Sequence, residues 1–390
     1  TVDLDKAVDL SHHARRSEDP YMAAKAMVSA GKLCVRFYAN DDAMALYREG
    51  VAFAAQLSEA QRVCLSLELG EIRMNAQQVE DWQGLVDEFV ALAEHAMDHG
   101  SRAHARLGYQ MASYLRWIHG ENTGAKRFSL QAERLSRGAS DEAQIMGLAE
   151  AAKCLALLER DLSRAEAMIM EASSLAQRVG FDCPAIPKTL GIMRYHGDQF
   201  EEAVDHLEDA RALAKSSGDR LTEYMANEYL TIVEMERRDC AAAQDYATSL
   251  VDIGARIREG SERPFAESLQ AVCRFGLSDD DSGLEQALVE LRHADAKQRL
   301  SFVLNRAAIQ YIEHSQLERG RECAREALEL ARVMERPSET LQALLSLERI
   351  HRADSQLEPA SYLDQIEQIA AGGVPGWVRK RLDELLVTQE

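Results

Sequence analysis

The feature that most limits what this chain can fold into is a helical hairpin that recurs about every forty residues. Equivalent positions in the first helix of each hairpin fall at residues 31, 70, 112, 153, 191 and 230, so the steps between them are 39, 42, 41, 38 and 39 residues. The next aligned position, 308, lies 78 residues further on, which is two more steps of 39. One such hairpin cannot bury its apolar face alone, so the recurrence predicts a stacked array.

The clearest hairpin runs from Pro184 to Asp219 and has a small residue on each helix, which allows the two backbones to approach closely. This stretch resembles the tetratricopeptide repeat (TPR), whose pattern has Leu-Gly in the first helix and Ala-x3-Phe in the second. The residues that match are Leu190, Gly191, Ala203 and Ala210. Three depart from the pattern, with Arg194 in place of its Tyr, Leu207 in place of its Phe and Pro187 in place of its Trp.

The resemblance implies an all-α, right-handed superhelical solenoid of TPR-like hairpins. Because the standard repeat is about 34 residues long, the longer step here predicts a variant with longer helices. We expect about nine helix pairs over residues 1–371, then a hinge and one capping helix over residues 372–390. The expected pairs are 21–37 with 41–56, 59–75 with 81–99, 102–119 with 122–137, 141–159 with 163–179, the hairpin at 184–219, 220–237 with 240–258, 263–275 with 282–294, 297–314 with 317–334, and 338–352 with 359–371.

Glycines support these boundaries, because a helix commonly ends in a left-handed residue that glycine adopts without strain. They stand at the expected helix ends as Gly100, Gly120, Gly180, Gly197, Gly218 and Gly260. The chain opens at Thr1 without an initiator methionine and enters a helical pattern at once, which leads us to expect a fragment of a longer protein.

Composition narrows the function. The 390 residues carry a net charge of −20, which disfavours binding to the phosphate backbone of nucleic acids and to anionic membrane surfaces. The seven cysteines have no CxxC spacing, so neither a zinc knuckle nor a dithiol motif is encoded, and a reducing cytoplasm fits best. No apolar run is long enough to span a membrane.

No catalytic motif is present either. The sequence lacks a phosphate-binding P-loop, a GxGxxG loop and a GxSxG elbow, and we expect no enzyme activity and no cofactor. The best candidate metal ligands are His95 and His99, one helical turn apart. Histidines in a last helical turn are more simply explained by the helix dipole, so we expect no metal site.

In TPR arrays the first helices line a concave groove, and the resemblance implies that their exposed side chains bind the partner. Asparagine can satisfy a peptide backbone, arginine or lysine can meet a carboxylate, and an aromatic ring can bury an anchor side chain. Carried over repeat by repeat, the expected binding residues are Lys32, Arg36, Asn75, Tyr109, Arg116, Trp117, Lys188, Tyr195, His196, Tyr224, Asn227, Phe302 and Asn305.

The sequence leaves two functions open. The first is a non-enzymatic TPR module of bacterial regulation that binds a protein or peptide segment in the groove, without direct contact to nucleic acid or membrane and with its oligomeric state open. The second is a small-ligand sensor, because the long repeat also resembles the helical-repeat domains of bacterial signal-transduction ATPases, including maltotriose-regulator-like transcription activators. A flanking ATPase would favour the sensor, and a free-standing chain would favour the scaffold.

Overall fold

The computed structural model describes residues 2–16, 18–77, 80–256, 261–278, 280–294, 296–371, 379–380 and 383. Over these residues the regular structure is helical throughout. The helices are α1 (Val2–Ala14), α2 (Pro20–Arg36), α3 (Asn40–Ala54), α4 (Glu59–Ala76), α5 (Trp82–Asp98), α6 (Arg102–Ile118), α7 (Asn122–Ser136), α8 (Asp141–Leu157), α9 (Leu162–Val179), α10 (Ala185–His196), α11 (Phe200–Ser217), α12 (Arg220–Glu236), α13 (Cys240–Gly254), α14 (Glu262–Ser278), α15 (Leu284–His293), α16 (Lys297–Glu313), α17 (Leu317–Val333), α18 (Pro337–Ala353) and α19 (Leu363–Ala371).

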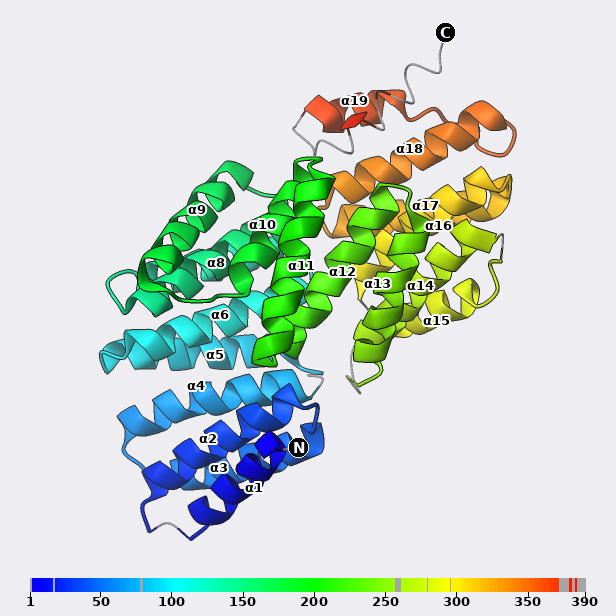
Figure 1. The fold of residues 1–390 in the computed structure, drawn as a ribbon. Coiled ribbons are helices and arrows are strands. Elements are labelled where there is room, and N and C mark those ends of the chain that lie inside the picture. Colours follow the sequence, from blue (N-terminus) through cyan, green and yellow to red (C-terminus); the bar gives the residue numbers. More distant parts are fainter. Residues whose placement is uncertain are drawn as a thin grey trace.

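From α2 onward the helices form the expected pairs, and their ends agree closely with the ranges predicted from the sequence. The stack runs from α1–α3 at one end to α18 and α19 at the other, with α11 and α12 crossing its middle (Figure 1). The all-α solenoid is therefore confirmed. The proposed hinge and capping helix fall mostly outside the described residues, so the division at residue 371 stays a prediction.

Small residues do bring the paired helices together. A Cβ atom added to Gly191 would lie 2.5 Å from Leu207 Cγ and 3.2 Å from the Ala203 carbonyl oxygen, so α10 and α11 could not pack as they do with a larger residue there. In the third pair the close approach is made by Ser113, whose hydroxyl donates to the Ala125 carbonyl at 2.8 Å. The packing position there lies one residue after the aligned position 112.

The turns follow the predicted chemistry with one difference. Gly100, Gly120, Gly180 and Gly218 have positive φ angles, as expected of residues that end helices. Gly197 does not, since its φ is −84° and the left-handed step falls on Asp198, with φ 60°. Asparagine and aspartate tolerate this region better than most residues, so the turn forms one residue later than predicted. Gly260 lies outside the described residues.

The even-numbered helices form an inner layer. They pack on one another along most of the array, as α2 on α4, α8 on α10, α10 on α12, α14 on α16 and α16 on α18, whereas the odd-numbered helices contact mainly their neighbours in sequence. The curvature of a solenoid brings the helices on its concave side closer together. The first helices of the pairs therefore form the more closely packed layer, and the binding groove expected along them stays a prediction.

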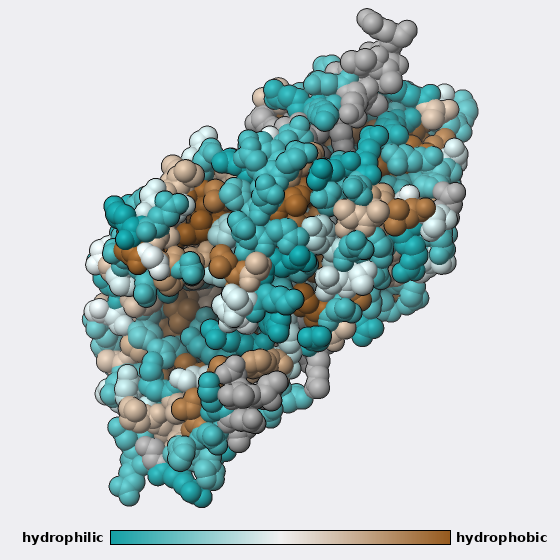
Figure 2. Space-filling view, in the orientation of Figure 1, coloured by the Kyte–Doolittle hydropathy of each residue, from teal (hydrophilic) through white to brown (hydrophobic). Residues whose placement is uncertain are grey.

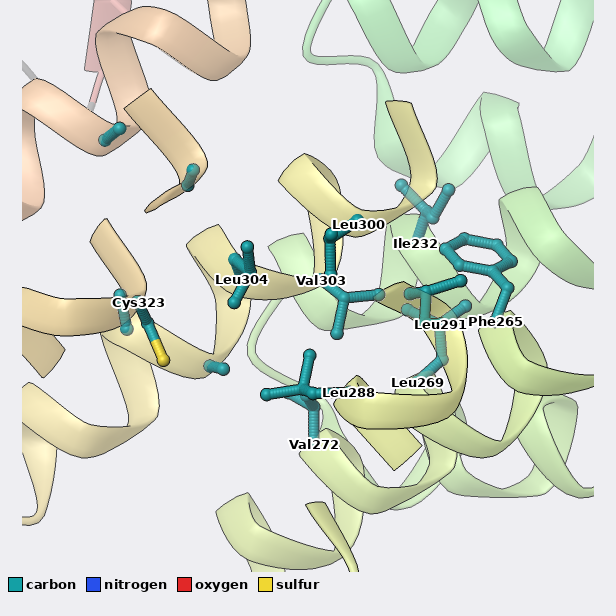
Figure 3. Close-up of a cluster of buried hydrophobic side chains, with 14 of the residues drawn as sticks. Ile232, Phe265, Leu269, Val272, Leu288, Leu291, Leu300, Val303, Leu304 and Cys323 are labelled. Carbon is teal, nitrogen blue, oxygen red and sulfur yellow. The ribbon is translucent and has the colours of Figure 1, made fainter. Parts of the chain in front are cut away.

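The largest core cluster fills the C-terminal half, from Tyr195 in α10 to Ile366 in α19. Figure 3 shows part of this cluster, to which α12, α14, α15, α16 and α17 all contribute side chains. The N-terminal half has separate clusters instead, one around α1–α4, a small one of Ala125, Cys154 and Leu158, one around α4–α7 and one around α8–α10. The break between the last two clusters is where the candidate site lies.

The array also curls back on itself. The turn before α18 meets the turns that follow α6 and α8, although these segments are 175 to 212 residues apart in sequence. Asn122 donates to the Met334 carbonyl at 2.7 Å, and Arg336 donates to the Leu157 carbonyl at 2.8 Å. We call this contact between the two halves the closing junction.

Candidate functional site

A cavity of about 290 Å³ opens on the inner layer between α6 and α8. These two helices lack the close packing that joins most neighbouring inner helices in the described part of the chain, and the space between them is bounded by α4, α10 and α12. On the face seen in Figure 2, hydrophilic residues predominate, and hydrophobic surface is recessed between α6 and α8. The cavity is thus a gap in the stack rather than a uniform groove.

One side of this cavity is apolar and aromatic. Leu107, Met111 and Trp117 of α6 face Leu157 of α8 and Met225 of α12 across it. The indole nitrogen of Trp117 is buried without a hydrogen-bond acceptor among the described residues. Buried polar groups are usually satisfied, so this N–H is suited to an acceptor on a bound molecule.

The other side of the cavity is charged. Arg106, Lys153 and Lys188 lie around Glu150, a partly buried carboxylate that pairs directly with Lys153. Burial opposes ionisation of Glu150, but the nearby cations Lys153, Lys188 and Arg106 outweigh it and lower the pKa of this carboxyl group below its ordinary value.

Lys188 is the most enclosed of these cations, with only 3% of its surface exposed. Its ammonium group donates to the Thr222 hydroxyl at 3.1 Å. Burial, together with the positive charge of Lys153, lowers the pKa of Lys188 to about 8, although Glu150 and Asp219 act in the opposite direction. The same enclosure is seen at Tyr114, where burial raises the pKa of the phenol to about 12.

Three of the sequence-predicted binding residues line this cavity, namely Asn75, Trp117 and Lys188. Lys32 and Arg36 are exposed on α2, and Lys32 forms an ion pair with Glu71 at 2.6 Å, so it lies beside the cavity wall. Lys32 is thus connected to the cavity through Glu71, and Arg36 follows it one helical turn later on α2.

The other predicted residues are occupied within the fold. In α6, Tyr109 is buried against Phe128 with ring centroids 5.8 Å apart, and Arg116 pairs with Glu121. Tyr195 and His196 are buried at the end of α10. The role of these residues in binding stays a prediction. In the structure their side chains lie in contacts between helices.

The predicted residues of the C-terminal half join consecutive inner helices. The Tyr224 hydroxyl donates to the Glu262 carbonyl at 2.8 Å, and the Asn305 amide donates to Glu339 Oε2 at 2.6 Å. The Asn227 amide donates to the Glu223 carbonyl at 2.8 Å within α12. Phe302 packs under the Arg306 guanidinium group, which lies 3.6 Å from the ring centroid.

Arg306 itself lies in a buried ion-pair network. It is 3% exposed and donates to Glu236 Oε1 at 2.6 Å and to Glu339 Oε2 at 2.6 Å. A second, larger cavity of about 770 Å³ adjoins it, lined by residues of α12, α14, α16 and α18. Because two carboxylates are already bound to Arg306, this cation is engaged within the fold, and its removal would leave two buried carboxylates without it.

Sequence reasoning missed the residues that give the cavity its charge, Arg106, Glu150 and Lys153. Lys153 did carry a signal, because the repeat alignment placed a long, charged side chain at a position held by glycine in three other pairs, at Gly31, Gly70 and Gly191. The structure shows that Lys153 lines the cavity instead of packing against its own second helix.

The histidine and cysteine predictions concern metals and redox chemistry. Within the described ranges, no group of three or more His, Cys, Asp or Glu side chains is arranged to hold a metal ion. The seven cysteines are all present as free thiols. A membrane-crossing helix is likewise not found, since none of the described helices is both long and apolar enough.

Comparison with solved structures identifies the fold. The chain is similar to a Rap protein complexed with Competence and Sporulation Factor, with a TM-score of 0.52 and 11% identity over 81% of this chain and 99% of that one. It is also similar to aspartyl phosphate phosphatase F from Bacillus subtilis, with a TM-score of 0.50 and 13% identity over 79% and 92% of the two chains.

A third similar structure is the Rap conjugation gene regulator of the plasmid pLS20 in complex with the Phr* peptide, with a TM-score of 0.52 and 13% identity over 87% of this chain and 98% of that one. At such identities the likeness establishes the fold, a TPR-like helical-repeat solenoid. No family model matches the sequence. No curated protein matches it either.

Proposed function

We propose that this chain is a non-enzymatic regulatory module of bacterial origin that binds a peptide or an extended protein segment at the cavity between α6 and α8. The observation that carries the proposal is the cavity itself, which combines an apolar wall, an unsatisfied indole N–H and a buried charged cluster on the inner layer. Binding sites for such ligands are concave and mostly apolar, with a few polar groups that fix orientation.

The structural neighbours support this choice over the small-ligand sensor. Two of the three similar structures are complexes, one with Competence and Sporulation Factor and one with the Phr* peptide. The third is named as an aspartyl phosphate phosphatase. That name describes the neighbour, and the proposal for this chain remains binding, in the cytoplasm, without catalysis.

Leu221 allows a direct test, because it lines the cavity and is nevertheless 44% exposed, so the helix tolerates a polar residue there. We would measure fluorescence anisotropy of fluorescein-labelled random hexapeptide pools with the wild type and with Leu221→Glu. Binding by the wild type, weakened about tenfold by Leu221→Glu, is the expected result.

The matched control is Leu277→Glu, which changes a leucine that is 51% exposed at the end of α14, far from the residues that line the cavity. This control should bind like the wild type. No binding of any pool, or equal loss with both variants, would contradict the proposed site.

A further inference from the structure

The inner layer concentrates positive charge at one place in an acidic protein. The whole chain has a net charge of −20, yet Arg106, Lys153 and Lys188 converge on one end of the cavity. Three carboxylates also line the cavity, and two of them are engaged elsewhere, since Glu71 pairs with Lys32 and Asp219 caps α12 by accepting from the Thr222 N–H at 3.1 Å. Their charges still act on the cavity, because Glu71 favours the charged form of Arg106 and Asp219 that of Lys188. With Lys32 included, four cations meet three carboxylates, so one positive charge is in excess.

The hydrogen bonds of these cations confirm the surplus. Lys153 is bound to Glu150, Arg106 donates to the neutral Gln110 side chain at 2.7 Å, and the described hydrogen bond of Lys188 goes to the neutral Thr222 hydroxyl. A buried ammonium group that meets a hydroxyl rather than a carboxylate is poorly compensated. An additional anion in the cavity would supply the missing charge.

We propose that the ligand is anchored by a carboxylate, which binds at the end of the cavity formed by Lys188, Lys153 and Arg106. This inference rests on the proposed function and specifies the chemistry that the site selects. Charge-assisted hydrogen bonds to a carboxylate are short and strong in an enclosed site. The apolar wall, with Leu107, Met111 and Met225, then receives the uncharged part of the ligand.

The acidic surface of the protein makes this anchor selective. A negatively charged segment is repelled by most of a chain that carries 65 Asp and Glu against 45 Lys and Arg. Only a ligand that reaches the buried cations gains from its carboxylate. Such an arrangement gives specificity through the difference between one favourable location and many unfavourable ones.

The carboxylate can come from an acidic side chain or from the C-terminus of the ligand, and the experiment separates the two. Three hexapeptide pools would be titrated into the protein, all acetylated at the N-terminus. The first contains one Asp or Glu and ends in an amide, the second has no acidic side chain and ends in a free carboxylate, and the third has neither. We expect at least one acidic pool to bind about tenfold more tightly than the third.

Lys188→Met tests the anchor itself, because methionine keeps the length of the side chain without its charge. This variant should abolish the preference for the acidic pool and leave binding of the third pool unchanged. The matched control is Lys126→Met, which removes a lysine of α7 that pairs with Asp161 at 2.6 Å, outside the residues that line the cavity. It should keep the preference.

A small probe tests the anion site without any peptide. Succinate, compared with chloride at equal ionic strength, should raise the Tm of the wild type and of Lys126→Met by about 1–2 °C and that of Lys188→Met by less. If the third pool binds as tightly as the acidic ones, or if Lys188→Met keeps their preference, the carboxylate anchor is wrong while peptide binding stands. If no pool binds but succinate acts through Lys188, the anion site stands and the peptide proposal is wrong.

Discussion

The two halves of this solenoid are built from the same helical hairpin but differ in how their buried charged groups are paired. Between α12 and α18 the buried apolar side chains form one cluster beside the larger cavity, and the buried cation there, Arg306, is bound by two carboxylates, Glu236 and Glu339. Between α6 and α8 the core is interrupted, and the charged groups lie around a cavity with cations in excess. Both halves contain a cavity, so the difference lies in how completely the charged side chains beside it are paired.

The balance of charge explains why one region stabilises and the other is suited to binding. Removing one partner of a complete buried ion pair is strongly destabilising because it leaves an uncompensated charge, whereas a buried cation without a carboxylate partner leaves free energy to be gained by a ligand. Four measurements would test this comparison.

The largest expected effect is at the completed network. Arg306→Met leaves Glu236 and Glu339 buried without their cation, so the free energy of unfolding should fall by about 3–5 kcal/mol. Urea unfolding followed by circular dichroism measures this. The triple variant Arg306→Met, Glu236→Leu, Glu339→Leu serves as the control and should recover most of the loss. A single variant as stable as the wild type would show that the network contributes nothing.

The second comparison is between two leucines. Leu304→Ala empties a fully buried position in the continuous core and should cost about 2–5 kcal/mol. Leu107→Ala removes a half-buried side chain beside an existing cavity and should cost about 1 kcal/mol. The same unfolding assay decides between them, and equal losses would mean that the α6–α8 interface is packed as tightly as the others.

Replacing Lys188 by an uncharged residue should increase the stability of the fold. Its pKa of about 8 lies below the ordinary value of 10.5, so below pH 8 both the folded and the unfolded state hold the proton and the cost of burying the charge is present in full. Between pH 8 and 10.5 only the unfolded state keeps the proton, and folded stability rises with pH.

Lys188→Met should therefore raise the free energy of unfolding by about 1–3 kcal/mol at pH 7, and this gain should vanish by about pH 10.5. Unfolding curves at several pH values measure it. A gain that does not change with pH would show that the buried charge is not its cause.

The smallest expected effect is at the closing junction that joins the two halves. Glu159 accepts hydrogen bonds from Arg336 at 2.9 Å and from the Ser338 hydroxyl at 2.5 Å, and it is buried beside His196. Glu159→Gln should cost about 1–3 kcal/mol and increase the radius of gyration measured by small-angle X-ray scattering.

Glu335→Gln is the control at the same junction, because the Glu335 side chain is 70% exposed and its ion pair with Arg160 should be worth under about 1 kcal/mol. An unchanged radius of gyration in Glu159→Gln would mean that repeat packing alone sets the curvature of the array.

The sequence by itself determined the helices, their pairing and the side of each pair that faces inward. These follow from local rules, since an apolar stripe sets the buried face of a helix, and residues such as Gly191 and Gly218 fix the close approaches and the turns. They repeat with each hairpin and do not depend on distant parts of the chain.

Tertiary structure alone decided which inner residues are accessible. Phase in the repeat placed Asn227, Asn305 and Lys188 in equivalent positions, but the packing of the helices buried the first two within the fold and left Lys188 at a cavity. Curvature sums small rotations between successive repeats, and the closing junction depends on contacts up to 212 residues apart. No local sequence pattern specifies the total curvature. This is why Arg106, Glu150 and Lys153 could not be recognised as one cluster before the fold was known.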